Sequence, residues 1–141
     1  MKDLLRIEDL TKKFKKKNFF SSDSNEVIAA DSVNFSLEQG KILAIAGQSG
    51  SGKSTIAKLI LRAIKPDSGK IFHNQKEIMD NSDELKKFRM KCQMIYQDPY
   101  DSINPRMTIS DIVSEPLEIH NIGTKKEREQ RVIETLEKVK L

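Results

Sequence analysis

Hydrophobic and polar positions alternate near the start of the chain. From Val33 to Leu37 the period is two, which is typical of a strand with one face in a core and the other in solvent. Residues 3–10 and 27–37 are therefore expected to be strands. The polar, lysine-rich segment 12–26 between them is expected to be a loop, so the two strands form an antiparallel β portion.

Other segments have different patterns. Residues 42–46 are continuously apolar and residues 92–96 are largely apolar, which predicts short strands buried on both faces over 41–46 and 92–96. A further short strand is expected at 70–72. Apolar residues recurring every three or four positions predict helices over 56–64, over 82–90, from about Thr108, and over 124–139. Pro116 is expected to break or kink the third of these, and Thr124 with Glu127 forms a capping-box pattern at the start of the fourth. The fold class is therefore α/β.

Composition excludes several classes of protein. No apolar run approaches the roughly 20 residues of a membrane-spanning helix, and residues 1–6 lack the apolar stretch of a secretion signal. We therefore expect a cytoplasmic protein. One cysteine, Cys92, excludes an internal disulfide and a cysteine-rich metal site. His73 and His120 lie far apart in the sequence, which argues against a histidine-based zinc site.

The positive charge is local. The net charge is +4, yet residues 1–20 hold seven basic and three acidic side chains, and the other 121 residues are balanced. A nucleic-acid-binding protein more often carries a basic face throughout, so no nucleic-acid partner is expected. The lysines at 12–17 are interpreted as a solvated segment, with lipid head groups or nucleic acid as the alternative contacts.

A glycine-rich segment carries the clearest chemistry. It matches the phosphate-loop pattern G-x-x-x-x-G-K-[ST] and comprises Gly47, Gln48, Ser49, Gly50, Ser51, Gly52, Lys53, Ser54 and Thr55. Glycines let successive backbone N–H groups curl around phosphates, and a helix N-terminus favours the anion. Lys53 is expected to reach the β- and γ-phosphates, Ser54 to bind Mg²⁺, and Thr55 to bind near the α-phosphate. Nucleoside kinases, GTPases and transport ATPases all share this loop.

Two further segments narrow these possibilities. Residues 94–109 read MIYQDPYDSINPRMTI and are followed by EPL at 115–117. They resemble the Q-loop region of ABC transporter ATPases, and in particular the oligopeptide and dipeptide importer branch. Residues 29–35, AADSVNF, resemble the strand that precedes the phosphate loop in that branch. The resemblance covers essentially the whole chain.

The resemblance implies roles for two more residues. Gln97 would be the Q-loop glutamine, which contacts Mg²⁺ and the attacking water. Phe14 stands where the family has an aromatic residue that stacks on adenine, with Phe19 and Phe20 as competing candidates. The implied cofactors are ATP and Mg²⁺. The implied partners are transmembrane permease subunits, a second ATP-binding subunit and, indirectly, an extracytoplasmic substrate-binding protein, at the inner face of the cell membrane.

Some of the family's motifs are missing from the sequence. It has no Gly-Gly pair, so it lacks the Leu-Ser-Gly-Gly-Gln signature, and no strand after the phosphate loop ends in the Asp-Glu of Walker B. The expected organisation is the N-terminal portion of an ABC-type nucleotide-binding domain. It comprises an antiparallel β portion (1–40), a P-loop NTPase core up to the Q-loop (41–97) and the start of a helical subdomain (98–141). We expect such a chain to bind nucleotide weakly, if at all, and not to hydrolyse it.

Three other functions stay open from the sequence. The cargo of the importer could be nickel or a metallophore instead of peptides, because the same ATPase branch serves both. The chain could be a non-catalytic truncated remnant, or a module that docks on a full-length partner. A stand-alone P-loop kinase is the third alternative, against which residues 97–107 argue.

Overall fold

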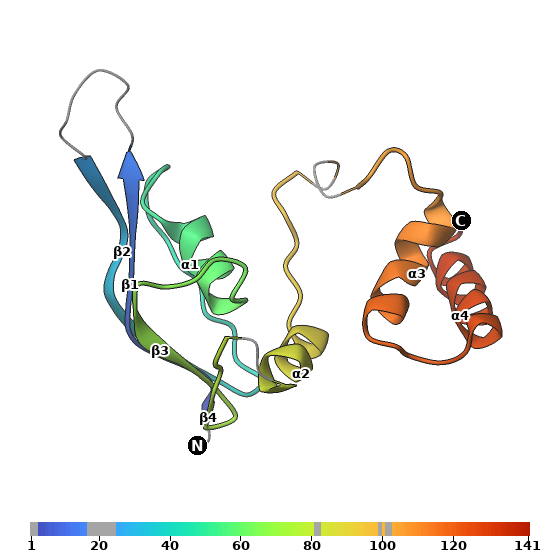
Figure 1. The fold of residues 1–141 in the computed structure, drawn as a ribbon, viewed down its shortest axis with the longest axis horizontal. Helices are drawn as coiled ribbons and strands as arrows, with labels where there is room; N and C mark the ends of the chain where they lie inside the picture. Colours follow the sequence, from blue (N-terminus) through green and yellow to red (C-terminus); the bar gives the residue numbers. More distant parts are fainter. Residues whose placement is uncertain (1–2, 17–24, 81–82, 99, 101–102) are drawn as a thin grey trace. The chain divides into compact units, whose positions relative to one another are not determined.

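The computed structural model describes residues 3–16, 25–80, 83–98, 100 and 103–141. It divides into two compact units, Met1–Met94 and Ile95–Leu141 (Figure 1). The division expected from the sequence at residues 40 and 97 stays a prediction. None of the helices in the described ranges combines the length and apolar character that crossing a membrane requires.

The first unit is built on an antiparallel sheet. Its strands are β1 (Asp3–Lys16), β2 (Asn25–Glu38), β3 (Ser68–His73) and β4 (Lys76–Glu77), in the order β2-β1-β3-β4. In the central strand, Ile7 pairs with Phe35 of β2 on one side and with Ile71 of β3 on the other. The antiparallel β portion predicted from the alternating pattern is therefore confirmed.

The hairpin of β1 and β2 is longer than predicted. Residues 12–16 and 25–26 were expected in a loop, but they continue the two strands, and Phe14 pairs with Val27. Charged side chains are tolerated here because they are paired: the half-exposed Lys13 and Glu26 form an ion pair at 3.9 Å, and the more covered Lys12 pairs with Asp67. Phe19 and Phe20 lie outside the described residues.

Two helices cover one face of this sheet: α1 (Lys53–Ile60) and α2 (Asp83–Lys91). Their buried residues share one hydrophobic core with those of the strands, and Figure 1 shows both helices on the same side of the sheet. The core comprises Ile7, Leu10, Ala30, Ile56, Leu59, Ile71, Ile78, Leu85 and Phe88. Because α1 begins where the phosphate loop ends, and its Ile56 and Leu59 belong to this core, the core fixes the C-terminal end of the loop.

Helix α1 ends earlier than the periodicity predicted. The pattern favoured a helix to residue 64, but Arg62 adopts a left-handed conformation with φ of 53°. The helix ends there in a Schellman motif, in which the Ala63 N–H donates to the carbonyl of Lys58 and the Arg62 N–H donates to that of Leu59. A short turn with buried Pro66 then leads into β3.

The two predicted fully buried strands are absent from the described structure. Residues 41–46 form neither helix nor strand, and Ile42 is 98% exposed. Residues 92–96 also form no strand, and Ile95 is 92% exposed. A strand buried on both faces needs neighbouring strands and covering layers. Among the described residues no strand pairs with either segment, so apolar side chains of both segments stay exposed.

The second unit contains α3 (Ile109–Ile119) and α4 (Lys125–Lys138), which pack against each other. Both begin with a capping box, Thr108 with Asp111 and Thr124 with Glu127, as predicted for the second. Pro116 does not break α3, which continues to Ile119. Only Val132 of α4 is buried, so this helix pair has a small core.

Candidate nucleotide-binding site

The phosphate-loop segment forms an exposed turn that leads directly into α1. Gly50 and Gly52 adopt left-handed conformations, with φ of 79° and 91°, which favour glycine. Gly52 is the N-cap of α1, and no side chain caps the first turn. Backbone N–H groups at such a helix start have no intrahelical partner. No acidic residue lies in that turn, so its N–H groups are suited to an anion.

The Lys53 ammonium lies inside the curl of this loop. Its Nζ donates hydrogen bonds to the carbonyl oxygens of Gly47, at 2.7 Å, and Gln48, at 2.6 Å. The Ser51 hydroxyl lies 3.4 Å from the same nitrogen. A lysine ammonium has three donor hydrogens, so the loop and its lysine form one hydrogen-bonded unit. The positive charge is therefore held where the uncapped helix start also attracts negative charge.

Gly52 has a second constraint that the motif alone does not reveal. A β-carbon on residue 52 would overlap the carbonyl oxygen of Ala29 in β2. A β-carbon on residue 50 would instead lie in open space. The Ala29 backbone therefore packs directly against the phosphate loop at Gly52. The sequence did not predict this contact, because Ala29 belongs to no spacing motif. The only signal was its place in the AADSVNF segment.

The donor set fits a nucleotide phosphate with Mg²⁺. Ser54 is exposed in the first turn of α1, and Thr55 follows it half-buried. The described residues contain no group of three or more His, Cys, Asp or Glu side chains that could hold a metal by themselves. Such an arrangement suits Mg²⁺ bound through one side chain together with phosphate oxygens and water, as Mg²⁺ prefers.

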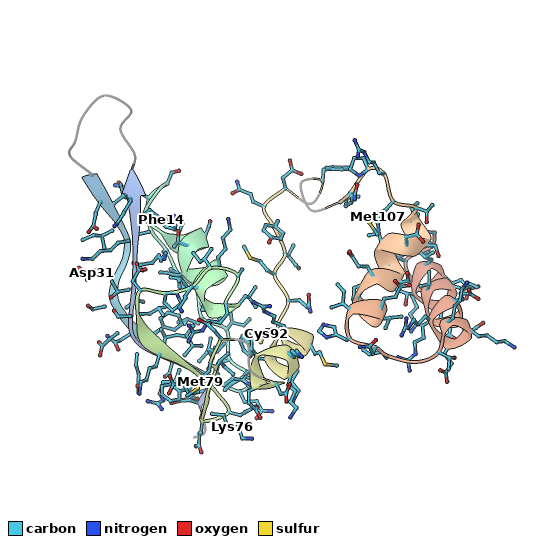
Figure 2. All side chains as sticks on the ribbon, viewed as in Figure 1. Phe14, Asp31, Lys76, Met79, Cys92 and Met107 are labelled. Carbon is cyan, nitrogen blue, oxygen red and sulfur yellow. The ribbon has the colours of Figure 1, made fainter. Side chains whose placement is uncertain are left out.

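Phe14 lies near the C-terminal end of β1 and is 42% exposed (Figure 2). The Lys12 ammonium lies over its ring, 5.6 Å from the centroid. Lys12 in turn pairs with Asp67, at 3.0 Å between Nζ and Oδ1. From the sequence, Lys12 was identified only as one lysine of the cluster at 12–17, and Asp67 was not connected with Phe14. Asp67 is 55 positions from Lys12, and no motif connects them.

Gln97 is exposed and belongs to the second unit. The role of Gln97 therefore stays a prediction. Near it, the N–H of Tyr100 donates to the Asp98 carboxylate at 2.9 Å, which turns the chain. His120 caps the C-terminus of α3, where its N–H donates to the carbonyl of Pro116.

Two titratable groups outside the loop have shifted pKa values. His73 packs against Phe88, with ring centroids 5.2 Å apart. Burial, and secondarily the charge of Lys91, lower the pKa of His73. Burial raises the pKa of the Cys92 thiol. Both residues line a cavity of about 320 Å³ with largely apolar walls, and a neutral imidazole and a neutral thiol fit that environment.

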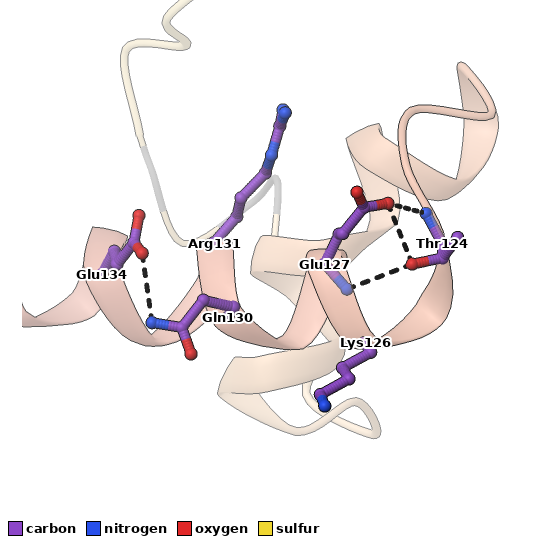
Figure 3. A pocket seen from close by; sticks show the side chains of 6 residues that line it. All are labelled: Thr124, Lys126, Glu127, Gln130, Arg131 and Glu134. Atoms are coloured by element: carbon purple, nitrogen blue, oxygen red, sulfur yellow. Dashed lines mark hydrogen bonds between the residues drawn. The ribbon is translucent and has the colours of Figure 1, made fainter.

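An open, polar hollow of about 520 Å³ lies on α4 (Figure 3). Several of its groups already bond one another. The Glu127 carboxylate accepts from the Thr124 N–H at 2.6 Å, and Gln130 donates to Glu134 at 3.1 Å. The Thr124 N–H and hydroxyl lower the pKa of Glu127. The first of these bonds belongs to the capping box of α4, and the second is a side-chain bond between successive turns of the same helix.

Comparison with known proteins gives one consistent picture. A family model described as ABC transporter matches residues 30–141. The chain is 39% identical, over 98% of its length, to the oligopeptide transport ATP-binding protein AppF of Bacillus subtilis. It is 38% identical, again over 98% of its length, to the dipeptide transport ATP-binding protein DppF of Haemophilus influenzae.

Solved structures agree on the fold. A dimeric bacterial ABC transporter cassette matches 94% of the chain, with a TM-score of 0.74 and 28% identity. A dimeric ATP-binding cassette in a post-hydrolysis state with ADP and phosphate matches the same share, with a TM-score of 0.72 and 27% identity. The chain spans 56% of each solved cassette and about two fifths of the curated relatives, 43% and 42%.

Proposed function

Because the chain belongs to the ABC transporter family, we propose that it forms the ATP-binding part of an ATP-binding subunit that energises peptide uptake. One observation carries the proposal: left-handed glycines and an uncapped helix start surround the Lys53 ammonium. The peptide cargo rests on similarity to oligopeptide and dipeptide transport ATP-binding proteins. The family match leaves the stand-alone kinase without support.

Different residues of the site contact different parts of ATP. Backbone N–H groups around Gly50 and Gly52 bind phosphate oxygens, and the helix start adds its partial positive charge. Lys53 exchanges one of its carbonyl partners for a phosphate oxygen, and this charge-assisted hydrogen bond is stronger than the one it replaces. The Ser54 hydroxyl holds Mg²⁺, which when bound neutralises phosphate charge. The ring of Phe14 stacks on adenine.

Gln97 would act with Mg²⁺ and the attacking water and would link the site to membrane partners. Its exposed position is consistent with such a contact. The proposed partners are transmembrane permease subunits, a second ATP-binding subunit and, through the permease, an extracytoplasmic substrate-binding protein. The subunit would lie at the inner face of the cell membrane. Nickel or metallophore import requires the same machinery, and identifying the permease that co-purifies with the chain distinguishes the cargoes.

We propose that these 141 residues alone do not hydrolyse ATP. The sequence lacks Walker B carboxylates, so Mg²⁺ has no acidic anchor after the loop and the attacking water has no general base from that strand. The test is phosphate release by the purified chain with ATP and Mg²⁺. Release that is abolished by Lys53→Ala and retained by Lys58→Ala, a lysine on the same helix, would overturn this proposal.

The exposed apolar segments favour a second candidate, a module that docks on further cassette polypeptide. Ile42 and Ile95 are almost fully exposed in segments whose sequence is typical of buried strands. Apolar side chains exposed together in one segment, as Ile42, Leu43 and Ile45 are, favour an interaction surface. A pull-down with an intact subunit of the same family tests this candidate. Retention that is lost in Ile42→Asp supports it, and no retention of the unaltered chain contradicts it.

A further inference from the structure

Asp67 ties the turn after α1 to the strand that carries Phe14. Its N–H donates to the Thr11 carbonyl at 2.9 Å. Its carboxylate accepts from the Lys13 N–H at 2.7 Å through Oδ2, and pairs with the Lys12 ammonium at 3.0 Å through Oδ1. One residue thus holds three consecutive positions of β1, just before Phe14.

Lys12 contacts both Asp67 and the aromatic ring of Phe14. Its side chain is only 16% exposed, so it has little freedom to leave its position. With Oδ1 of Asp67 fixing the ammonium, the same ammonium lies over the Phe14 ring, 5.6 Å from the centroid. A cation over one ring face is attracted by the ring's negative quadrupole. That face is then occupied, and a base can stack only on the other.

We propose that Asp67 and Lys12 form a clamp that orients Phe14 for stacking on the nucleotide base. Both are positioning residues, because they act through the ring and not on the nucleotide. The clamp also couples the base-binding and phosphate-binding ends of the site, since Asp67 follows the helix that begins at Lys53. This inference rests on the proposed ATP-binding function and adds to it what determines the geometry of the base.

The pKa of Asp67 favours a clamp that persists at neutral pH. The backbone N–H of Lys13 and the side chain of Lys12 lower the pKa of Asp67. The carboxylate is therefore ionised at neutral pH. Asp67→Asn removes the charge but keeps an oxygen for the Lys13 N–H, and Lys12→Met removes the ammonium but keeps the apolar stem. These two variants therefore disturb the clamp with little loss of packing.

The first experiment needs no nucleotide. NMR of the 141-residue chain, with labelled phenylalanine, reports the ring resonances of Phe14. Asp67→Asn and Lys12→Met should shift these resonances and average the ring rotamers. Glu26→Gln is the matched control, because that carboxylate pairs with Lys13 at 3.9 Å in the same hairpin. Unchanged Phe14 resonances in both clamp variants would overturn the proposal.

The second experiment separates base from phosphate by comparing ATP with inorganic tripolyphosphate. Asp67→Asn should weaken ATP binding about twofold to fivefold, the size of a partly exposed cation–π contact, and leave tripolyphosphate binding unchanged. In a Phe14→Ala background the same substitution should have no further effect on ATP. Equal weakening of both ligands, or additive losses, would show a merely structural role. No binding of either ligand by the unaltered chain would contradict the proposed function, and the ring resonances would still decide the clamp.

Discussion

Gly52 at the start of α1 lies directly against the backbone carbonyl of Ala29 in β2. The contact is so close that no β-carbon fits at residue 52. Gly52 therefore joins two requirements at one position, a left-handed backbone with φ of 91° and a close approach of two main chains. The phosphate loop is shaped by the strand behind it as well as by its own glycines.

This contact predicts that Gly52→Ala destabilises the first unit more than the conformational strain alone. A non-glycine residue in a left-handed conformation costs about 1–2 kcal/mol. Gly40→Ala is the matched control, since Gly40 has φ of 76° but open space around it. Urea denaturation measures both. Equal losses of unfolding free energy in the two variants would show that the Ala29 contact is unimportant.

The exposed segment 41–46 should tolerate substitution unusually well. Ile42 is 98% exposed, whereas Ile71 is fully buried between the sheet and its helices. Ile42→Ala should change the unfolding free energy by less than about 0.5 kcal/mol, and Ile71→Ala should cost about 2–5 kcal/mol. The measurement is urea unfolding of both variants. A large loss in Ile42→Ala would mean that residues 41–46 belong to the core after all.

The capping box of α4 predicts that helicity depends on pH. The Thr124 N–H and hydroxyl lower the pKa of Glu127, so its folded pKa lies below its unfolded value. Its contribution is therefore present above the unfolded pKa of about 4.3 and lost as the pH falls through the folded pKa. Circular dichroism should show α4 losing helicity below about pH 4.

Thr124→Ala provides the control for that titration. It removes the cap, lowers the stability of α4 by about 1 kcal/mol, and should flatten the pH dependence. Thr108→Ala, in the equivalent capping box of α3, should leave the titration of Glu127 in place. If Thr124→Ala keeps the full pH dependence, another carboxylate is responsible.

The phosphate loop could be predicted from sequence because its chemistry needs particular residue types at fixed spacing. The exposure of segment 41–46 could not be predicted, because hydrophobicity shows that a residue favours burial but not whether neighbouring strands are present to bury it. Its apolar residues favour burial, yet in the described structure nothing pairs with them. The pairing of Lys12 with Asp67 could not be predicted either, because the two charged residues are 55 positions apart and belong to no common motif.

The loop around Lys53 is proposed to bind the triphosphate of ATP. The most direct measurement is an NMR titration of the chain with ATP and Mg²⁺, following the backbone amides of residues 47–55. We predict saturable shifts at these amides with weak affinity, lost in Lys53→Ala and retained in Lys58→Ala. Shifts that persist unchanged in Lys53→Ala, or none at the loop amides at saturating ATP, would contradict the account.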